Sequence, residues 1–159
     1  MATYEGSSGI AQLKAKIALK SKMLVGESLE KINTHMVDES VVGAKYYLAA
    51  NGTAGVVNDQ GDFKNSWNVG IGQADKSIRE ADTSGAGAIA NGIVKGKMYN
   101  LQENNYVTNN VDHADLVEDG WKDNPEYGWK AKDGYHVVAS NIGAAEAILE
   151  AVADKVSKL

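Results

Sequence analysis

Apolar residues recur at helical spacing near both ends of the chain, and this pattern constrains the fold most strongly. Residues 10 to about 50 predict one long helix, and the C-terminal stretch predicts a second. The two stripes consist of Ile10, Leu13, Ile17, Leu24, Ile32 and Met36, and of Ile142, Ala145, Leu149, Val152 and Val156. We expect the first helix to kink or break at Gly26 or Gly43, because glycine costs about 1 kcal/mol relative to alanine in a helix interior. Asn51–Gly52 is expected to end it.

The middle of the chain predicts a strand, turns and short helices. Trp67, Val69 and Ile71 alternate with polar or small residues, which is typical of a strand with one buried face. The other expected elements are a loop at 53–62, a charged and mobile segment at 73–82, a short helix after Gly85, a hairpin of 98–101 with 106–109, a helical turn at 113–119 and a loop at 120–134. This order predicts an α+β fold, in which a small antiparallel β-sheet packs with a long N-terminal helix and a C-terminal helix.

Composition favours a single domain that spans residues 1–159, with residues 1–9 as a flexible tail. The chain has 159 residues, of which 43% are hydrophobic, so it can bury one core. The lack of cysteine excludes disulfides and thiolate metal sites, which fits a reducing compartment. We find no signal peptide and no apolar run that approaches the roughly 18 residues of a membrane span, so we expect a soluble protein made in the cytoplasm.

Net charge argues against a dedicated nucleic-acid binder. The chain carries a formal charge of −5, whereas DNA affinity rests on lysine and arginine neutralising phosphates. Four lysines, Lys14, Lys16, Lys20 and Lys22, leave a basic patch open as an alternative to a solvated helix face. An acidic surface would suit a conduit through which DNA slides without sticking.

Two segments resemble ligand-binding motifs, but each lacks features that the motif requires. Gly85 to Ala90 resembles a dinucleotide fingerprint, but a buried strand does not precede it. Asn58 to Asp62 resembles a calcium loop, but Phe63 stands where the loop needs glycine and Val69 where it needs a bidentate carboxylate. We therefore expect neither a cofactor nor a metal.

Acid–base chemistry has candidates but no predicted pocket. On one helical turn, His113 cannot point at the same ion as Asp112, Asp115 and Glu118, so helix capping is the favoured interpretation of this cluster. A hydrolase would gather several of Asp112, Asp115, Glu118 and His136 in one pocket. With no cysteine nucleophile and no Gly-x-Ser-x-Gly motif, we do not expect an enzyme.

Two polar, aromatic-containing segments carry a resemblance to a known family. The first is Asn58-Asp-Gln-Gly-Asp-Phe-Lys-Asn-Ser-Trp67, and it resembles the Asp-Thr-Gly-x-Leu/Phe-x-x-Ser-Trp segment of tail-completion, or head-tail joining, proteins of tailed bacteriophages. The second runs from Tyr106 to Trp121 and is similar to the same family's Asn-x-x-x-Tyr-Ala-x-x-x-Glu-x-Gly segment, and Gly134-Tyr-His-Val stands at the expected entry to the last helix. The chain departs from the pattern with Gln60 for threonine, His113 for tyrosine and Val56–Val57 for a proline.

The resemblance implies a non-enzymatic virion protein at the neck or upper tail. It implies a homo-oligomeric ring, a hexamer or dodecamer, that joins the tail to the head beside other phage neck and tail proteins and lets the genome pass without sequence-specific binding. The alternative is a soluble module that binds carbohydrate or nucleic acid. Core packing and subunit contact both stay open for the aromatics, and contact regions are expected at 52–65, 73–84 and 120–134. The candidate interface residues are Asp59, Asp62, Phe63, Trp67, Trp121, Tyr127 and Trp129.

Overall fold

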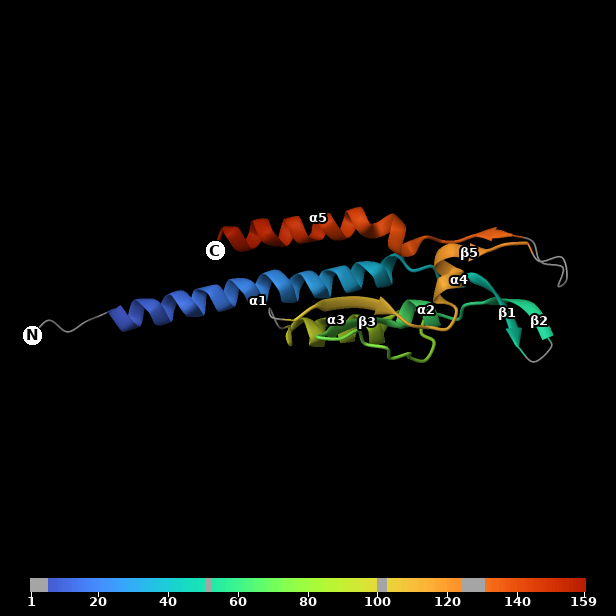
Figure 1. Cartoon of the computed structure of the whole chain (residues 1–159), viewed down its shortest axis with the longest axis horizontal. Coiled ribbons are helices and arrows are strands. Elements are labelled where there is room, and N and C mark those ends of the chain that lie inside the picture. Colours follow the sequence, from blue (N-terminus) through green and yellow to red (C-terminus); the bar gives the residue numbers. More distant parts are fainter. Residues whose placement is uncertain (1–5, 51–52, 100–102, 124–130) are drawn as a thin grey trace, which may run out of the picture.

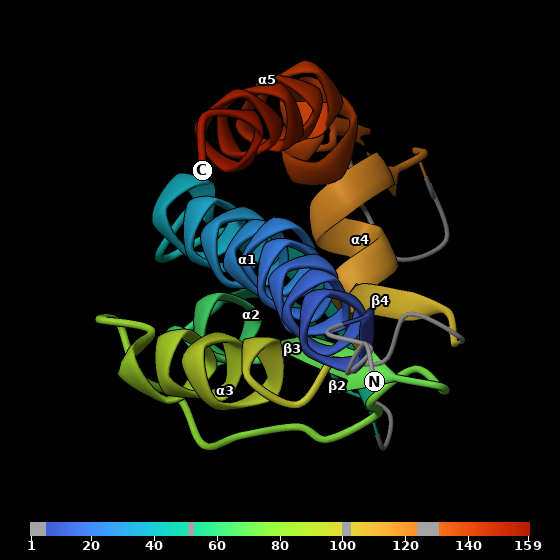
Figure 2. The same ribbon diagram turned by 90° about the vertical axis from the view of Figure 1, so that its left-hand side faces the viewer.

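One long helix, α1 (Gly6–Glu39), forms the axis of the molecule. The computed structural model describes residues 6–50, 53–99, 103–123 and 131–159. The C-terminal helix α5 (Val137–Ser157) runs antiparallel beside α1, and the N-terminal part of α1 projects past the end of α5 (Figure 1). Viewed along the long axis, α5 lies on one side of α1, and α3 (Ala86–Gly96) with β3 (Trp67–Ile71) lies on the other (Figure 2).

The first helix is shorter at its C-terminal end than the sequence predicts. It ends at Glu39, and a turn with Gly43 at φ 75° leads into β1 (Lys45–Ala50), which pairs antiparallel with β2 (Thr53–Asn58). The predictions of helix to about residue 50 and of a loop at 53–62 were therefore wrong, whereas the break expected at Gly43 is confirmed. Tyrosine and valine are enriched in 46–57, and these residue types favour strands. The expected stop at 51–52 lies outside the described residues.

At its N-terminal end α1 begins earlier than predicted. The helix starts at Gly6, so residues 6–9 belong to it and not to a flexible tail. Residues 1–5 lie outside the described part of the chain.

The central strand β3 is confirmed, and it pairs with the segment that was predicted to form a hairpin with 98–101. It pairs antiparallel with β4 (Asn105–Asn109), placing Val69 opposite Val107. The hairpin predicted between 98–101 and 106–109 was wrong, because Lys97 and Met98 form a turn after α3 and β4 pairs with β3 instead. Residues 100–101 of the predicted hairpin lie outside the described residues. A third antiparallel pair joins β5 (Gly120–Trp121) to β6 (Lys132–Asp133) within the predicted loop. Helices at both ends around small antiparallel sheets confirm the α+β class.

The contact between α1 and α3 depends on two facing glycines. A Cβ placed on Gly26 would lie 2.2 Å from the Gly96 carbonyl oxygen, and one on Gly96 would lie 2.6 Å from the Gly26 oxygen. The predicted kink at Gly26 does not occur, since α1 continues through it. Glycine at position 26 instead lets the two backbones touch. Further along, Asn33 Nδ2 donates to the Ala88 carbonyl at 2.8 Å.

The main core lies where the second half of α1 meets α2 (Asp62–Asn65), β3, α4 (Ala114–Asp119) and the start of α5. Its buried members are Met36, Val37, Ala44, Phe63, Trp67, Ala88, Val111, Val117 and Val137. The short helix α4 confirms the helical turn predicted at 113–119, and α3 confirms the helix predicted after Gly85. Within the described residues, no helix combines the length and apolar character needed to cross a bilayer.

Candidate functional site

Asp59 is the centre of a buried polar network. It follows β2, is 1% exposed, and its carboxylate accepts hydrogen bonds from the backbone N–H groups of Gly61 at 2.7 Å and Phe63 at 3.0 Å. Gly61 adopts φ 103°, a conformation that glycine reaches without strain. Asp59 and Gly61 thus form a tight turn that leads from β2 into α2.

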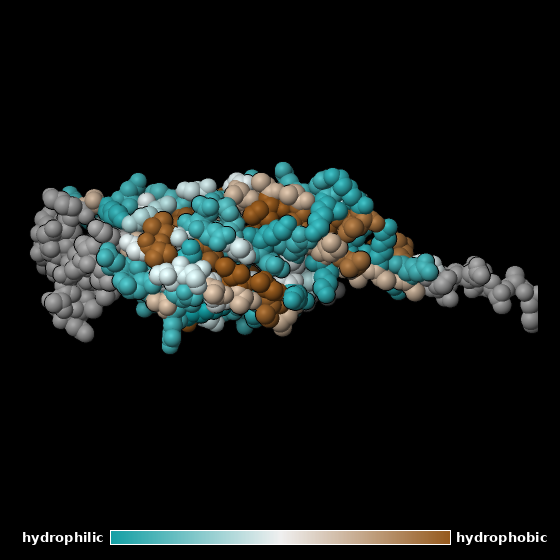
Figure 3. All heavy atoms as spheres, turned by 180° about the vertical axis from the view of Figure 1, so that it is seen from behind, coloured by the Kyte–Doolittle hydropathy of each residue, from teal (hydrophilic) through white to brown (hydrophobic). Residues whose placement is uncertain are grey.

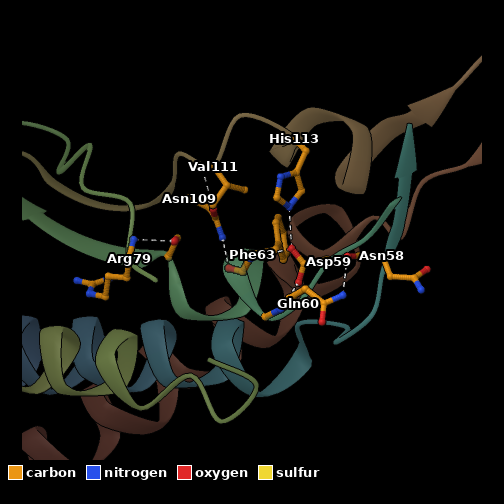
Figure 4. A network of polar contacts seen from close by, with 10 residues as sticks. Asn58, Asp59, Gln60, Phe63, Arg79, Asn109, Val111 and His113 are labelled. Atoms are coloured by element: carbon orange, nitrogen blue, oxygen red, sulfur yellow. Dashed lines mark hydrogen bonds and ion pairs between the residues drawn. The ribbon is translucent and has the colours of Figure 1, made fainter. Parts of the chain in front are cut away.

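The third partner of this carboxylate is His113, from the second of the two segments that carry the family resemblance. His113 Nε2 lies 2.7 Å from Asp59 Oδ2, and the side chain points from the start of α4 toward the Asp59 turn (Figure 4). Burial by itself raises the pKa of Asp59, but the hydrogen bonds from His113, Phe63 and Gly61 outweigh it and hold the pKa below the ordinary 3.8. The carboxylate is thus charged and satisfied inside the protein.

Asn109 makes a second bridge between the segments. Its Nδ2 donates to the Phe63 carbonyl at 2.6 Å, and its Oδ1 accepts from the Val111 N–H at 3.4 Å (Figure 4). Beneath this bridge the rings of Phe63 and Trp67 meet edge to face at 5.7 Å. Trp67 Nε1 donates to Ser40 Oγ at 2.7 Å, which connects the network to the end of α1.

The charged segment 73–82 is also held by specific hydrogen bonds. Arg79 Nη1 donates to the carbonyls of Asn65 and Trp67, each at 3.1 Å. Asn68 Nδ2 donates to the Ser77 carbonyl at 2.7 Å. The segment that the sequence suggested to be mobile is thus fastened to β3 at several points.

Glu118 connects the second segment to the last helix. Its carboxylate accepts from the N–H groups of Val138 at 3.0 Å and Ala139 at 3.0 Å, in the first turn of α5. These N–H groups have no partner within the helix, so the carboxylate caps α5 and lies at the favourable end of its dipole. Capping is thus the role of this acidic residue, although the helix it caps is α5 rather than its own.

The structure places the candidate interface residues in different environments. Asp59, Phe63 and Trp67 are buried within the chain, so they build the core rather than an exposed contact surface. Asp62 is half-buried at the start of α2, and Trp121 is half-buried with the Lys132 ammonium 5.8 Å from its ring centre. Tyr127 and Trp129 lie outside the described residues.

The structure brings some of the candidate acid–base residues together and keeps others apart. Asp115 and Glu118 line one surface pocket of about 250 Å³ beside Phe63 and Val138. His136 instead lies 3.2 Å from Asp133, and His35 bonds to Asn141. Among the residues that the structure describes, no group of three or more acidic or histidine side chains is placed to hold a metal ion.

In the two segments that imitate ligand sites, polar groups are hydrogen-bonded to other residues of the chain. Both oxygens of Asp59 are used by N–H donors, which makes the calcium-like segment a capped turn. At the fingerprint-like segment, which opens α3, Asn65 Oδ1 accepts from the Ala88 N–H at 3.1 Å. The segment before it is irregular and is not a strand.

The contact between Asp59 and His113 was not predicted, although both segments were singled out. The two residues are 54 positions apart, and no periodicity relates them. The resemblance alone marks both positions, since Asp59 matches the first pattern and His113 stands where the second pattern has tyrosine. Comparisons with protein-family models, curated proteins and solved structures give no match to this chain.

Proposed function

We propose that this protein is a structural virion component of a tailed bacteriophage, joining the tail to the head at the neck or upper tail. In this role it forms a homo-oligomeric ring, a hexamer or dodecamer, around the channel through which the genome passes. Its partners are further copies of itself and other phage neck and tail proteins. It assembles in the host cytoplasm, without a membrane and without sequence-specific DNA contacts.

The single observation that carries the proposal is the direct contact between the two segments that resemble the family patterns. Asp59 and Phe63 of the first segment bond directly to His113 and Asn109 of the second. Phe63 and Asn109 both match the family patterns, and His113 stands where the second pattern has tyrosine, so positions marked by the patterns in two distant parts of the sequence meet in one network. A chance likeness of two separate segments does not explain why their matching residues contact each other.

The chemistry of the network supports a structural role. The Asp59 carboxylate accepts three hydrogen bonds, and Glu118 accepts bonds from the start of α5, so both acidic groups are used to hold backbone. Buried groups satisfied in this way rigidify a fold. A rigid junction between two surface segments suits a protein that must keep its shape within an assembly.

The exposed surface supports assembly with other protein. Large apolar side chains are exposed on both long helices, including Leu13 on α1 and Ile142 and Leu149 on α5. Figure 3 shows hydrophobic patches on the body and on the projecting end of α1. Apolar surface of this kind marks contact sites. A formal charge of −5 fits a DNA channel that does not hold its DNA.

Electron microscopy of phage particles that lack this protein tests the proposal. We expect DNA-filled heads and separate tails, and addition of the purified protein should restore joined particles. The variant Asp59→Ala should fail to restore joining, whereas Asp62→Ala should succeed, because only Asp59 bonds to the second segment. Normal joined particles without the protein would contradict the proposal, and so would salt-sensitive binding of the purified chain to DNA or tight binding to a carbohydrate.

A further inference from the structure

The projecting half of α1 carries an apolar stripe that nothing in the described chain covers. Ile10, Leu13 and Ile17 follow one another at helical spacing and are between 56% and 60% exposed. They lie on the part of α1 that extends past the C-terminal end of α5 (Figure 1). Three large apolar residues on one face of a free helix are typical of a segment that docks onto another surface.

The same half of α1 is basic. Between residues 6 and 26 it has Lys14, Lys16, Lys20 and Lys22 and no acidic residue, and Glu27 is the first. Lys14 is four positions after Ile10 and Lys20 three positions after Ile17, so both lysines border the stripe. The docking face is therefore an apolar row with positive edges.

A groove in the body offers the opposite surface. It lies between α1, α5 and the start of β4, has a volume of about 500 Å³, and its apolar walls come from Leu24, Leu29, Ile32, Leu149 and Ala153. Glu150 of α5 also lines it, and Glu146 lies one turn earlier on the same helix. Among the described residues neither carboxylate has an ion-pair partner, so the groove is apolar with a negative edge on α5.

Two buried acceptors in the wall of this groove also lack partners. Ser28 Oγ and Asn105 Oδ1 are shielded from solvent and make no hydrogen bond within the described chain. Buried acceptors of this kind are normally satisfied. Both residues line the groove, so a helix that enters it lies beside two polar groups without partners.

We infer that the projecting half of α1 from one copy lies in the α1–α5 groove of the next copy. The apolar stripe meets the apolar walls, and the lysines beside the stripe meet Glu146 and Glu150. The segment cannot reach the groove of its own chain, because Leu13 and Leu24 lie on one rigid helix about 16 Å apart. A second copy is the occupant, since every copy carries both complementary surfaces.

The contact is heterologous, because the surface that a copy gives differs from the surface that it receives. Such contacts repeat from copy to copy until a ring closes. The inference therefore names the contact surfaces of the ring, and it rests on the proposed function for ring closure alone. The docking step belongs to the chain by itself and is tested with purified full-length protein.

Disulfide trapping tests the docking, because the natural chain has no cysteine. Leu13→Cys and Ala153→Cys are made in separate chains and mixed under mild oxidation. A disulfide needs Cα atoms within roughly 7 Å, so only docked copies can join these positions. Docking raises the effective concentration of the two thiols, so we expect the mixed dimer at least about tenfold faster than in the control.

The matched control is Leu19→Cys mixed with Ala153→Cys. Leu19 is 55% exposed on the same projecting segment but points away from the stripe. Equal rates in the two mixtures would overturn the inference. Faster joining of Leu13→Cys to itself would also overturn it, because it would indicate a symmetric pairing of two α1 helices.

Charge reversal provides a second arm. Lys14→Glu with Lys20→Glu in the Leu13→Cys chain should slow the cross-link roughly threefold to tenfold, as expected for two partly exposed ion pairs. Glu146→Lys with Glu150→Lys in the Ala153→Cys chain should restore the rate. Restoration requires the two faces to meet, and a further loss would contradict the contact.

The docking and the proposed function fail separately. If the cross-link forms but particles without the protein are still joined, the head–tail role is wrong and the docking stands. If particles fall apart but the cross-link does not exceed the control, the joining role stands and the groove receives a different partner. That second result would overturn the inference.

Discussion

The α2–β3 region and the projecting half of α1 distribute their polar and apolar groups in opposite ways. Around β3 the side chains of Asp59, Asn65 and Arg79 bond within the chain, and those of Asp59 and Asn65 are buried. On the projecting half of α1 the apolar side chains are exposed and the lysines surround them. The first region makes its contacts within a single chain, whereas the second leaves its apolar face uncovered.

This contrast indicates where stability and assembly are located. Substitutions in the network should destabilise the folded chain, because they leave buried groups without partners. Substitutions on the stripe should leave the single chain folded and change only contacts between copies. Three sets of substitutions, in order of decreasing expected change in the free energy of unfolding, and one pH series test whether stability and assembly are located in different regions.

Asp59→Ala should have the largest effect. It removes the acceptor for His113, Gly61 and Phe63, and each buried donor left without a partner costs about 1–3 kcal/mol. Chemical denaturation should report this as a lower free energy of unfolding. The control Asp62→Ala, in the first turn of α2, should cost about 0.3–1 kcal/mol through the helix dipole. Equal losses at the two positions would show that the network does not hold the fold.

Two leucines on α1 allow a buried position to be compared with an exposed position on the projecting half. Leu29 is 8% exposed and Leu13 is 58% exposed. Leu29→Ala should destabilise the chain by about 2–5 kcal/mol because it opens a cavity. In dilute protein, Leu13→Ala should stay within about 0.5 kcal/mol of the parent. Thermal unfolding monitored by circular dichroism measures both, and a large loss at Leu13 would mean that α1 is covered within its own chain.

Glu118→Ala should have a smaller effect. The variant removes the acceptor of the first N–H groups of α5, and lost caps typically cost about 1 kcal/mol. Glu118→Gln is the control, since its amide oxygen can still accept. Hydrogen exchange at Val138 and Ala139 should speed up in the alanine variant and change little in the glutamine variant. Unchanged exchange in both would rule out the cap.

The pH dependence of stability should follow the titration of Asp59. The pKa of Asp59 is below 3.8 in the folded chain, so its contribution is present above pH 3.8 and is lost as the pH falls through the folded pKa. One such group changes the free energy of unfolding by at most about 1.4 kcal/mol per pH unit. Denaturation between about pH 2 and 5 should give a steeper slope for the parent than for Asp59→Asn. Equal slopes would show that the pKa of Asp59 is the same in the folded and the unfolded chain.

Local patterns accounted for several elements without tertiary information. The spacing of Ile142, Leu149 and Val156 predicts α5, and the alternation of Trp67, Val69 and Ile71 predicts β3. Both patterns are periodic within a single element, so neighbouring residues carry the whole signal.

Tertiary structure decided what distant residues share. It selected β4 as the partner of β3, brought His113 to Asp59, and set Glu118 under the start of α5. It also gave Gly26 its role, because only the facing Gly96 backbone explains why a side chain is missing there. These contacts join positions tens of residues apart, and a periodic pattern holds no information about which distant groups will meet. Residue spacing alone determined the helices and the central strand of this protein, whereas folding decided how its two polar segments became one network.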